Sequence, residues 1–137
     1  MFAILGLDHV VLRVSDLGAM IGFYRAVLGC TLERARDDIG LYQLRAGDSL
    51  IDLVTVDGEI GRRGGTAPDE DGRNLEHFCL RIEPFDEAAL TRHLATHGVD
   101  AGPVERRYGA DGYGPSLYLS DPEGNVVELK GPPEAEG

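Results

Sequence analysis

The chain has 137 residues, with 13 Lys and Arg against 24 Asp and Glu, so its formal net charge is −11. A chain this acidic repels phosphate backbones and anionic headgroups, which excludes nucleic acid and membrane surfaces as expected partners. A hydrophobic content of 42% is enough for a packed core. We expect a cytoplasmic protein, because no apolar run reaches the ~18 residues of a membrane span, the N-terminus does not resemble a signal peptide, and two cysteines are too few for a disulfide scaffold.

The first half of the chain predicts a strand, a helix and two further strands. Residues 8–14 are rich in β-branched and apolar residues, which is typical of a strand with His9 near its start. A helix is expected over residues 16–28, with Ser15 as its N-cap. Two short strands, separated by a turn, follow at residues 41–45 and 50–56.

The second half repeats this order. Residues 76–82 share His, Leu and Arg with residues 8–14 at the same positions, and both segments predict strands. A helix is expected over residues 86–97. It is followed by a glycine-rich loop and two strands, at residues 108–114, 116–119 and 126–130.

The repeat predicts a single domain, residues 1–131, made of two modules. Module one covers residues 1–57 and module two covers residues 75–131, and residues 58–74, rich in Gly, Arg and Asp, form the linker. Residues 132–137 contain two prolines and two glutamates and are expected to form a disordered tail.

The same residue types recur at equivalent places in the two modules. His9 is followed by Asp52 in one module, and His77 is followed by Glu128 in the other. One His on a strand is usually a surface or hydrogen-bonded residue, but packing alone gives no reason for His and then an acid twice. If the modules pair about a pseudo-twofold axis, two imidazoles and two carboxylates converge, which is a ligand set suited to a divalent first-row metal.

Three segments of the chain carry a wider resemblance. They read LDHVVLRVSDL, GFYRAVLG and DPEGNVVEL, at residues 7–17, 22–29 and 121–129. With these segments the chain resembles the vicinal oxygen chelate superfamily, which includes glyoxalase I, bleomycin-resistance proteins, fosfomycin-resistance enzymes and extradiol dioxygenases. The resemblance implies an α+β fold of two tandem βαβββ modules, whose curved mixed sheets enclose a metal site in a homodimer.

The resemblance also implies the ligands of one divalent ion per site, which would be Ni, Zn, Mn, Fe or Co. The family's ligands fall on His9, His77 and Glu128, with Asp52 at the position of a fourth. Asp is one methylene shorter than the Glu or Gln usual there, so Asp52 either binds the metal directly or reaches it through water.

Two further residues are expected to bind substrate. Arg13 falls on the arginine that contacts the glutathionyl carboxylate in glyoxalase I, and a structural ion pair is the alternative role. Tyr118 coincides with an active-site tyrosine of the fosfomycin-resistance enzymes. Val11 replaces their threonine, and their potassium loop and trailing arginine are absent, which argues against fosfomycin as the substrate.

The leading hypothesis is a metal-dependent lyase or isomerase of the glyoxalase type, acting on a small oxygenated, anionic substrate, with Glu128 as the catalytic proton shuttle. The first alternative is an extradiol-type dioxygenase with His9, His77 and Glu128 on Fe(II), where Asp52 as a fourth ligand would crowd the oxygen site. The second is a metal-supported small-molecule binding or resistance protein, with the glycine-rich stretches as lids.

Overall fold

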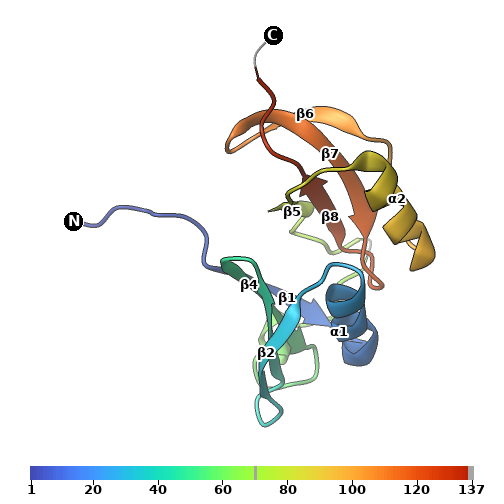
Figure 1. Ribbon diagram of the computed structural model, residues 1–137. Coiled ribbons are helices and arrows are strands. Elements are labelled where there is room, and N and C mark those ends of the chain that lie inside the picture. Colours follow the sequence, from blue (N-terminus) through green and yellow to red (C-terminus); the bar gives the residue numbers. More distant parts are fainter. Residues whose placement is uncertain (70, 136–137) are drawn as a thin grey trace. The chain divides into compact units, whose positions relative to one another are not determined.

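The computed structural model describes residues 1–69 and 71–135 (Figure 1). Its contacts divide the chain into two compact units, Met1–Arg73 and a second that starts at Asn74. Within the described ranges, each unit contains one four-stranded sheet and one α-helix. Among the described residues, no helix combines the length and the apolar character needed to cross a bilayer.

The first unit has the order strand, helix and three strands. Its elements are β1 (His9–Val14), α1 (Leu17–Ala26), β2 (Thr31–Arg36), β3 (Leu41–Ala46) and β4 (Ser49–Thr55), followed by a short 3₁₀ helix (Gly61–Gly64). The strands lie in the order β1-β4-β3-β2. The β1–β4 pair is parallel and the other pairs are antiparallel, because β1 reaches β4 by a crossover while the later strands follow one another through turns.

The second unit repeats the arrangement. Its elements are β5 (His77–Arg81), α2 (Glu87–Thr96), β6 (Glu105–Gly109), β7 (Gly112–Ser120) and β8 (Val126–Lys130). The strand order is β5-β8-β7-β6, again with a parallel first pair. Both units are therefore βαβββ modules, as the resemblance implies.

Apolar side chains on one face of each sheet form the cores with the helices. In the first unit the buried residues include Leu12, Val14, Met20, Phe23, Tyr24, Leu44, Ile51 and Leu53. In the second they include Leu94, Leu117, Leu119, Val127 and Leu129. Burying each such side chain contributes about 1.5–3 kcal/mol, and strand alternation leaves the opposite face of each sheet free for polar side chains.

Both helices begin one residue later than predicted. Asp16, not Ser15, is the N-cap of α1, and its side chain accepts a hydrogen bond from the Ala19 N–H at 3.1 Å. Asp86 caps α2 in the same way by accepting from the Ala89 N–H at 3.1 Å. The prediction of Ser15 as the N-cap is wrong, because the capped N–H belongs to Ala19 and the residue three positions before it is Asp16.

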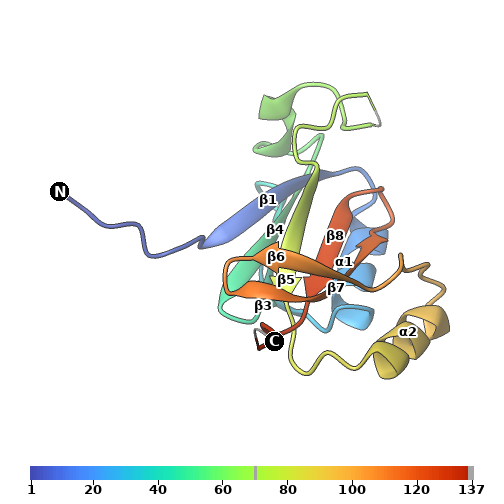
Figure 2. The ribbon, with the colours of Figure 1, turned by 90° about the horizontal axis from the view of Figure 1, so that it is seen from above.

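Two edge strands went unpredicted from the residue pattern. β2 and β6 are largely exposed and carry charged side chains, so they lack the alternation of apolar and polar residues that marks a half-buried strand. Residues 108–114, predicted as a loop, belong instead to the β6–β7 hairpin (Figure 2). Gly112, at φ 113°, supplies the left-handed residue that its tight turn needs.

The two ends of the chain differ in their attachment. The N-terminal segment extends away from its own sheet (Figures 1 and 2), with Phe2 and Leu5 among its exposed apolar residues. In the segment that follows β8, the Glu134 N–H donates to Tyr113 O at 2.7 Å, and the disorder expected from residue 132 onward stays a prediction. Residues 136–137 lie outside the described part.

Candidate metal centre

His9 and Asp52 lie beside each other on one face of the first sheet. In the β1–β4 pairing Val11 is opposite Asp52, so His9, two residues earlier, shares the face of the carboxylate. His9 Nε2 is 3.8 Å from Asp52 Oδ2. Asp52 is nearly buried, and Gln43 on β3 donates from Nε2 to both carboxylate oxygens at 3.3 and 3.2 Å. The structure therefore brings together the two predicted ligands of this unit.

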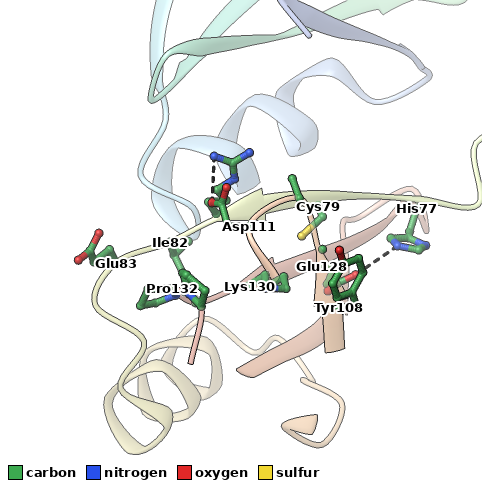
Figure 3. A pocket seen from close by; sticks show the side chains of 14 residues that line it. His77, Cys79, Ile82, Glu83, Tyr108, Asp111, Glu128, Lys130 and Pro132 are labelled. Atoms are coloured by element: carbon green, nitrogen blue, oxygen red, sulfur yellow. Dashed lines mark ion pairs between the residues drawn. The ribbon is translucent and has the colours of Figure 1, made fainter. Parts of the chain in front are cut away.

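His77 and Glu128 occupy the equivalent positions in the second sheet. Cys79 is opposite Glu128 in the β5–β8 pairing, and His77 Nε2 lies 3.2 Å from Glu128 Oε1 (Figure 3). Tyr118 on β7 is the cross-strand partner of Glu128, and its ring meets the His77 ring edge to face at 5.3 Å between centroids. The predicted substrate-binding Tyr118 thus lies beside the second His–carboxylate pair.

An acid immediately before each histidine orients its ring. His9 Nδ1–H donates to Asp8 Oδ1 at 2.6 Å, and His77 Nδ1–H donates to Glu76 Oε2. This bond raises the pKa of His9 above its ordinary value, and the negative charge of Asp52 adds to the effect. With the Nδ1 proton held by this acid, Nε2 is the ring atom on the side of the carboxylate, and it can bind a cation when it carries no proton.

Sequence reasoning missed the role of Asp8 and Glu76. The signal was present, because an acid precedes His in both halves of the repeat. Such an acid is normally assigned to the solvated surface, and only the side-chain geometry shows that it bonds the imidazole.

The donor set fits a divalent metal. Each unit supplies one imidazole nitrogen and one nearly buried carboxylate, and such nitrogen and oxygen donors suit Zn, Ni, Mn, Fe or Co. Among the described residues neither Asp52 nor Glu128 forms an ion pair with Lys or Arg. A buried carboxylate without a cation costs free energy, which a bound metal ion would offset. Within that same part of the chain no group of three or more candidate ligands lies together, so each unit holds half of the predicted set.

Weak acids surround Glu128. Burial, together with the Glu128 charge, raises the pKa of the Cys79 thiol to about 11. The same two causes raise the pKa of Tyr118 above its ordinary value. Both groups therefore stay protonated at neutral pH and can donate a hydrogen bond, which leaves Glu128 as the proton acceptor of this cluster.

Arg13 has a structural role in the first unit. Its Nε donates to Gly61 O at 2.7 Å, and its terminal nitrogens donate to Thr66 O at 3.0 Å and to Gly65 O. Gly64 makes room for the guanidinium, because a Cβ there would lie 2.4 Å from Arg13 Nε. Arg13 thus holds the predicted linker against β1, and this geometry gives no support to the predicted role as a substrate anchor.

A groove of about 520 Å³ opens on the same face of the second sheet. His77, Cys79, Glu128 and Lys130 line it (Figure 3). Arg81 is also part of its lining. Lys130 was not predicted as a site residue. A lysine at the end of a strand is usually exposed. The signal was that residues two apart on a strand point to the same face of the sheet, so Lys130 shares the face of Glu128.

Comparisons with known proteins identify the family and the fold. A family model described as the Glyoxalase/Bleomycin resistance protein/Dioxygenase superfamily matches residues 6–129. Virulence protein STM3117 of Salmonella typhimurium is 31% identical over 123 residues, which cover 90% of this chain and 81% of that protein. Glutathione transferase FosA of Serratia marcescens is also 31% identical over 123 residues, covering 90% and 78%. The solved structure of an integron cassette protein from the mobile metagenome of V. cholerae matches with a TM-score of 0.75 at 26% identity, covering 96% of this chain and 98% of that one. This likeness confirms the α+β fold.

Proposed function

Because the chain belongs to the glyoxalase/bleomycin resistance protein/dioxygenase superfamily, we propose that it is a divalent-metal-dependent enzyme of the glyoxalase type. It acts as a lyase or isomerase on a small oxygenated, anionic substrate. The observation that carries this proposal is the duplicated His–carboxylate pair, with the same strand register and the same orienting acid in both modules.

One ion is held by both pairs, with His9, His77 and Glu128 as ligands and Asp52 as a fourth. The modules that meet at the ion belong either to one chain or to two chains of a homodimer. A homodimer would also cover exposed apolar residues of the N-terminal segment, such as Phe2 and Leu5. When bound, the metal polarises a substrate carbonyl and stabilises negative charge that develops on neighbouring oxygens.

The residues around Glu128 carry the proton chemistry. Glu128 Oε1 takes a proton from the hydroxyl-bearing carbon next to a substrate carbonyl and returns it to the carbonyl carbon. The hydroxyl proton of the first carbon passes to the former carbonyl oxygen, so the isomerisation balances without an added base. Glu128 is nearly buried, and the Tyr118 hydroxyl beside it donates a hydrogen bond that orients the substrate. The neutral Cys79 thiol contributes to the wall of the groove.

A second candidate is thiol transfer to a small anionic molecule. It is favoured by the relative named as a glutathione transferase and by the position of Tyr118 beside Glu128. Val11 stands where the fosfomycin-resistance enzymes have threonine, so fosfomycin itself is a weak candidate substrate. Asp52 lies beside His9 and accepts hydrogen bonds from Gln43, which supports the proposal of a fourth ligand there and so counts against the extradiol dioxygenase alternative.

Metal content and turnover test the proposal together. The purified chain should bind about one divalent ion, and His77→Ala and Glu128→Gln should each abolish stoichiometric binding. Glu87→Gln, on the exposed surface of α2, is the matched control for the loss of one negative charge. Unchanged metal content in both site variants would overturn the ligand assignment.

Three substrate arms then separate the reaction classes. The Ni(II) or Zn(II) form should convert the hemithioacetal of methylglyoxal and glutathione, or a related 2-oxoaldehyde adduct, and Glu128→Gln should lose this activity. Conversion of fosfomycin with glutathione would favour thiol transfer. Oxygen consumption with catechol by the Fe(II) form would contradict the lyase or isomerase assignment.

A further inference from the structure

A nearly buried lysine lies beside Glu128 in the groove of the second unit. Lys130 ends β8 two residues after Glu128, so both side chains are on one face of the sheet (Figure 3). Lys130 is 6% exposed, and its Nζ donates to Gly112 O at 2.9 Å. Across residues 1–69 and 71–135, Lys130 takes part in no ion pair with a carboxylate.

Glycines on the neighbouring strands leave room for this side chain. A Cβ at Gly109 would lie 2.9 Å from Lys130 Cε, and one at Gly114 would lie 3.1 Å from Nζ. A buried ammonium held by one carbonyl is unfavourable, because it has lost its hydration without gaining an opposite charge. Its two further N–H donors suit an oxyanion that enters the groove.

Arg81 places a second cation at the same position of the groove. Arg81 and Lys130 are direct partners in the β5–β8 pairing, and both line the cavity of about 520 Å³. Arg81 Nη1 lies 3.3 Å from Asp111 Oδ2, and its side chain is 69% exposed, so the guanidinium can also reach a ligand in the groove. The two cations thus lie two residues along the β5–β8 pair from Cys79 and Glu128, in the same groove.

The first module lacks this arrangement. The β1–β4 pairing sets Arg13 opposite Val54, at the places of Arg81 and Lys130. Val54 is buried and uncharged, and the Arg13 guanidinium is bonded to backbone carbonyls of its own unit. The βαβββ fold therefore does not require a lysine here, although both modules keep the His–carboxylate pair.

We propose that Lys130 and Arg81 form an anion subsite that binds a carboxylate or phosphoryl oxyanion of the substrate. A net charge of −11 repels anions from most of the surface, so a local pair of cations is needed to attract and orient one. The inference rests on the proposed function in one respect, which is that the bound anion belongs to the substrate that reacts at Glu128.

Anion binding to the metal-free full chain tests the subsite directly. Inorganic phosphate and acetate are titrated separately into ¹⁵N-labelled protein in the presence of EDTA, and amide shifts are followed at Lys130, Gly112 and Arg81. Lys130→Met keeps the length of the side chain without its charge, and Arg81→Met removes the second cation. Arg92→Met, on the exposed surface of α2, removes one positive charge elsewhere in the same unit and is the matched control.

We expect saturable binding of at least one of the two anions at these amides. Lys130→Met should weaken it about ten- to a hundredfold, as expected for the loss of a charged hydrogen bond, and Arg81→Met should weaken it less because Arg81 is exposed. Arg92→Met should leave the affinity within about twofold. No saturable binding, or equal weakening in Arg92→Met, would overturn the subsite.

A parallel Zn²⁺ titration separates this inference from the proposed function. Lys130→Met should bind Zn²⁺ at least as tightly as the unmodified chain, because it keeps every proposed ligand. Phosphate or acetate binding at Lys130 in a chain that takes up no metal would uphold the subsite and contradict the metal-dependent enzyme.

Discussion

Glu76 provides a sharp test of how the candidate metal centre is built. Its carboxylate bonds His77 Nδ1, and its side chain is 84% exposed. Glu76→Gln keeps the size of the side chain but removes the charge that holds the proton on Nδ1 and raises the basicity of Nε2. The variant should therefore weaken metal binding without removing a ligand.

The expected loss follows from the position of this acid. Acids that orient a metal-binding imidazole typically contribute ten- to a hundredfold in affinity, or about 1.4–2.7 kcal/mol. Solvent screens the exposed Glu76, so we expect the lower limit, about tenfold. Asp8→Asn should have a similar effect through His9, because Asp8 is 89% exposed.

The double variant distinguishes one shared ion from two separate sites. If both histidines bind the same ion, the two losses add to about a hundredfold in one binding event. Affinity is measured by competition for Zn²⁺ with a chromophoric chelator, with Glu87→Gln as the control for the change of net charge. The reasoning is refuted if either single variant binds Zn²⁺ within twofold of the unmodified chain, or if each variant weakens only half of the bound ions.

Three further predictions concern the remaining structure. Burial and the charge of Glu128 raise the pKa of Cys79 to about 11, so its thiolate fraction in the metal-free chain should stay low until the pH approaches that value. The rate of Cys79 alkylation by iodoacetamide should increase with pH in parallel with the thiolate fraction. A midpoint near the ordinary pKa of 9 would contradict the assignment. Arg13→Ala should lower the free energy of unfolding by about 2 kcal/mol through the loss of its carbonyl contacts, and Gly64→Ala should cause a smaller loss by displacing the guanidinium. Both are measured by urea denaturation, and an unchanged unfolding midpoint in both variants would disprove the structural role of Arg13. Leu117→Ala, at 1% exposure in the second core, should cost about 2–5 kcal/mol in the same assay, and a loss under 1 kcal/mol would contradict its burial.

The duplicated elements were predictable because the repeat gives each pattern twice. A lone histidine on a strand indicates little, but His9 and His77 in matching segments located the ligand strands, and the structure places a carboxylate beside each. The central strands and the helices also have clear apolar periodicity. The helix ends shifted by a residue or two because capping depends on side-chain geometry, as Asp16 illustrates, and the strand predicted at residues 116–119 begins earlier, at Gly112.

The features that escaped prediction depend on contacts distant in sequence or on exposed residues. β2 and β6 are charged edge strands whose positions are set by pairing with a neighbour, which the residue pattern does not encode. For Arg13 a structural ion pair was the alternative expectation, but its partners are backbone carbonyls roughly fifty residues away, which no local pattern indicates. Lys130 lies buried because Gly109 and Gly114 on other strands leave room for it.

A crystal structure of the full chain grown with Zn²⁺, with anomalous data collected at the zinc edge, tests the central claim most directly. The account predicts one zinc peak per site, about 2.0–2.2 Å from Nε2 of His9, Nε2 of His77 and a carboxylate oxygen of Glu128, with Asp52 adjacent. A peak bound by one His–carboxylate pair alone, or no peak at either pair, would contradict it.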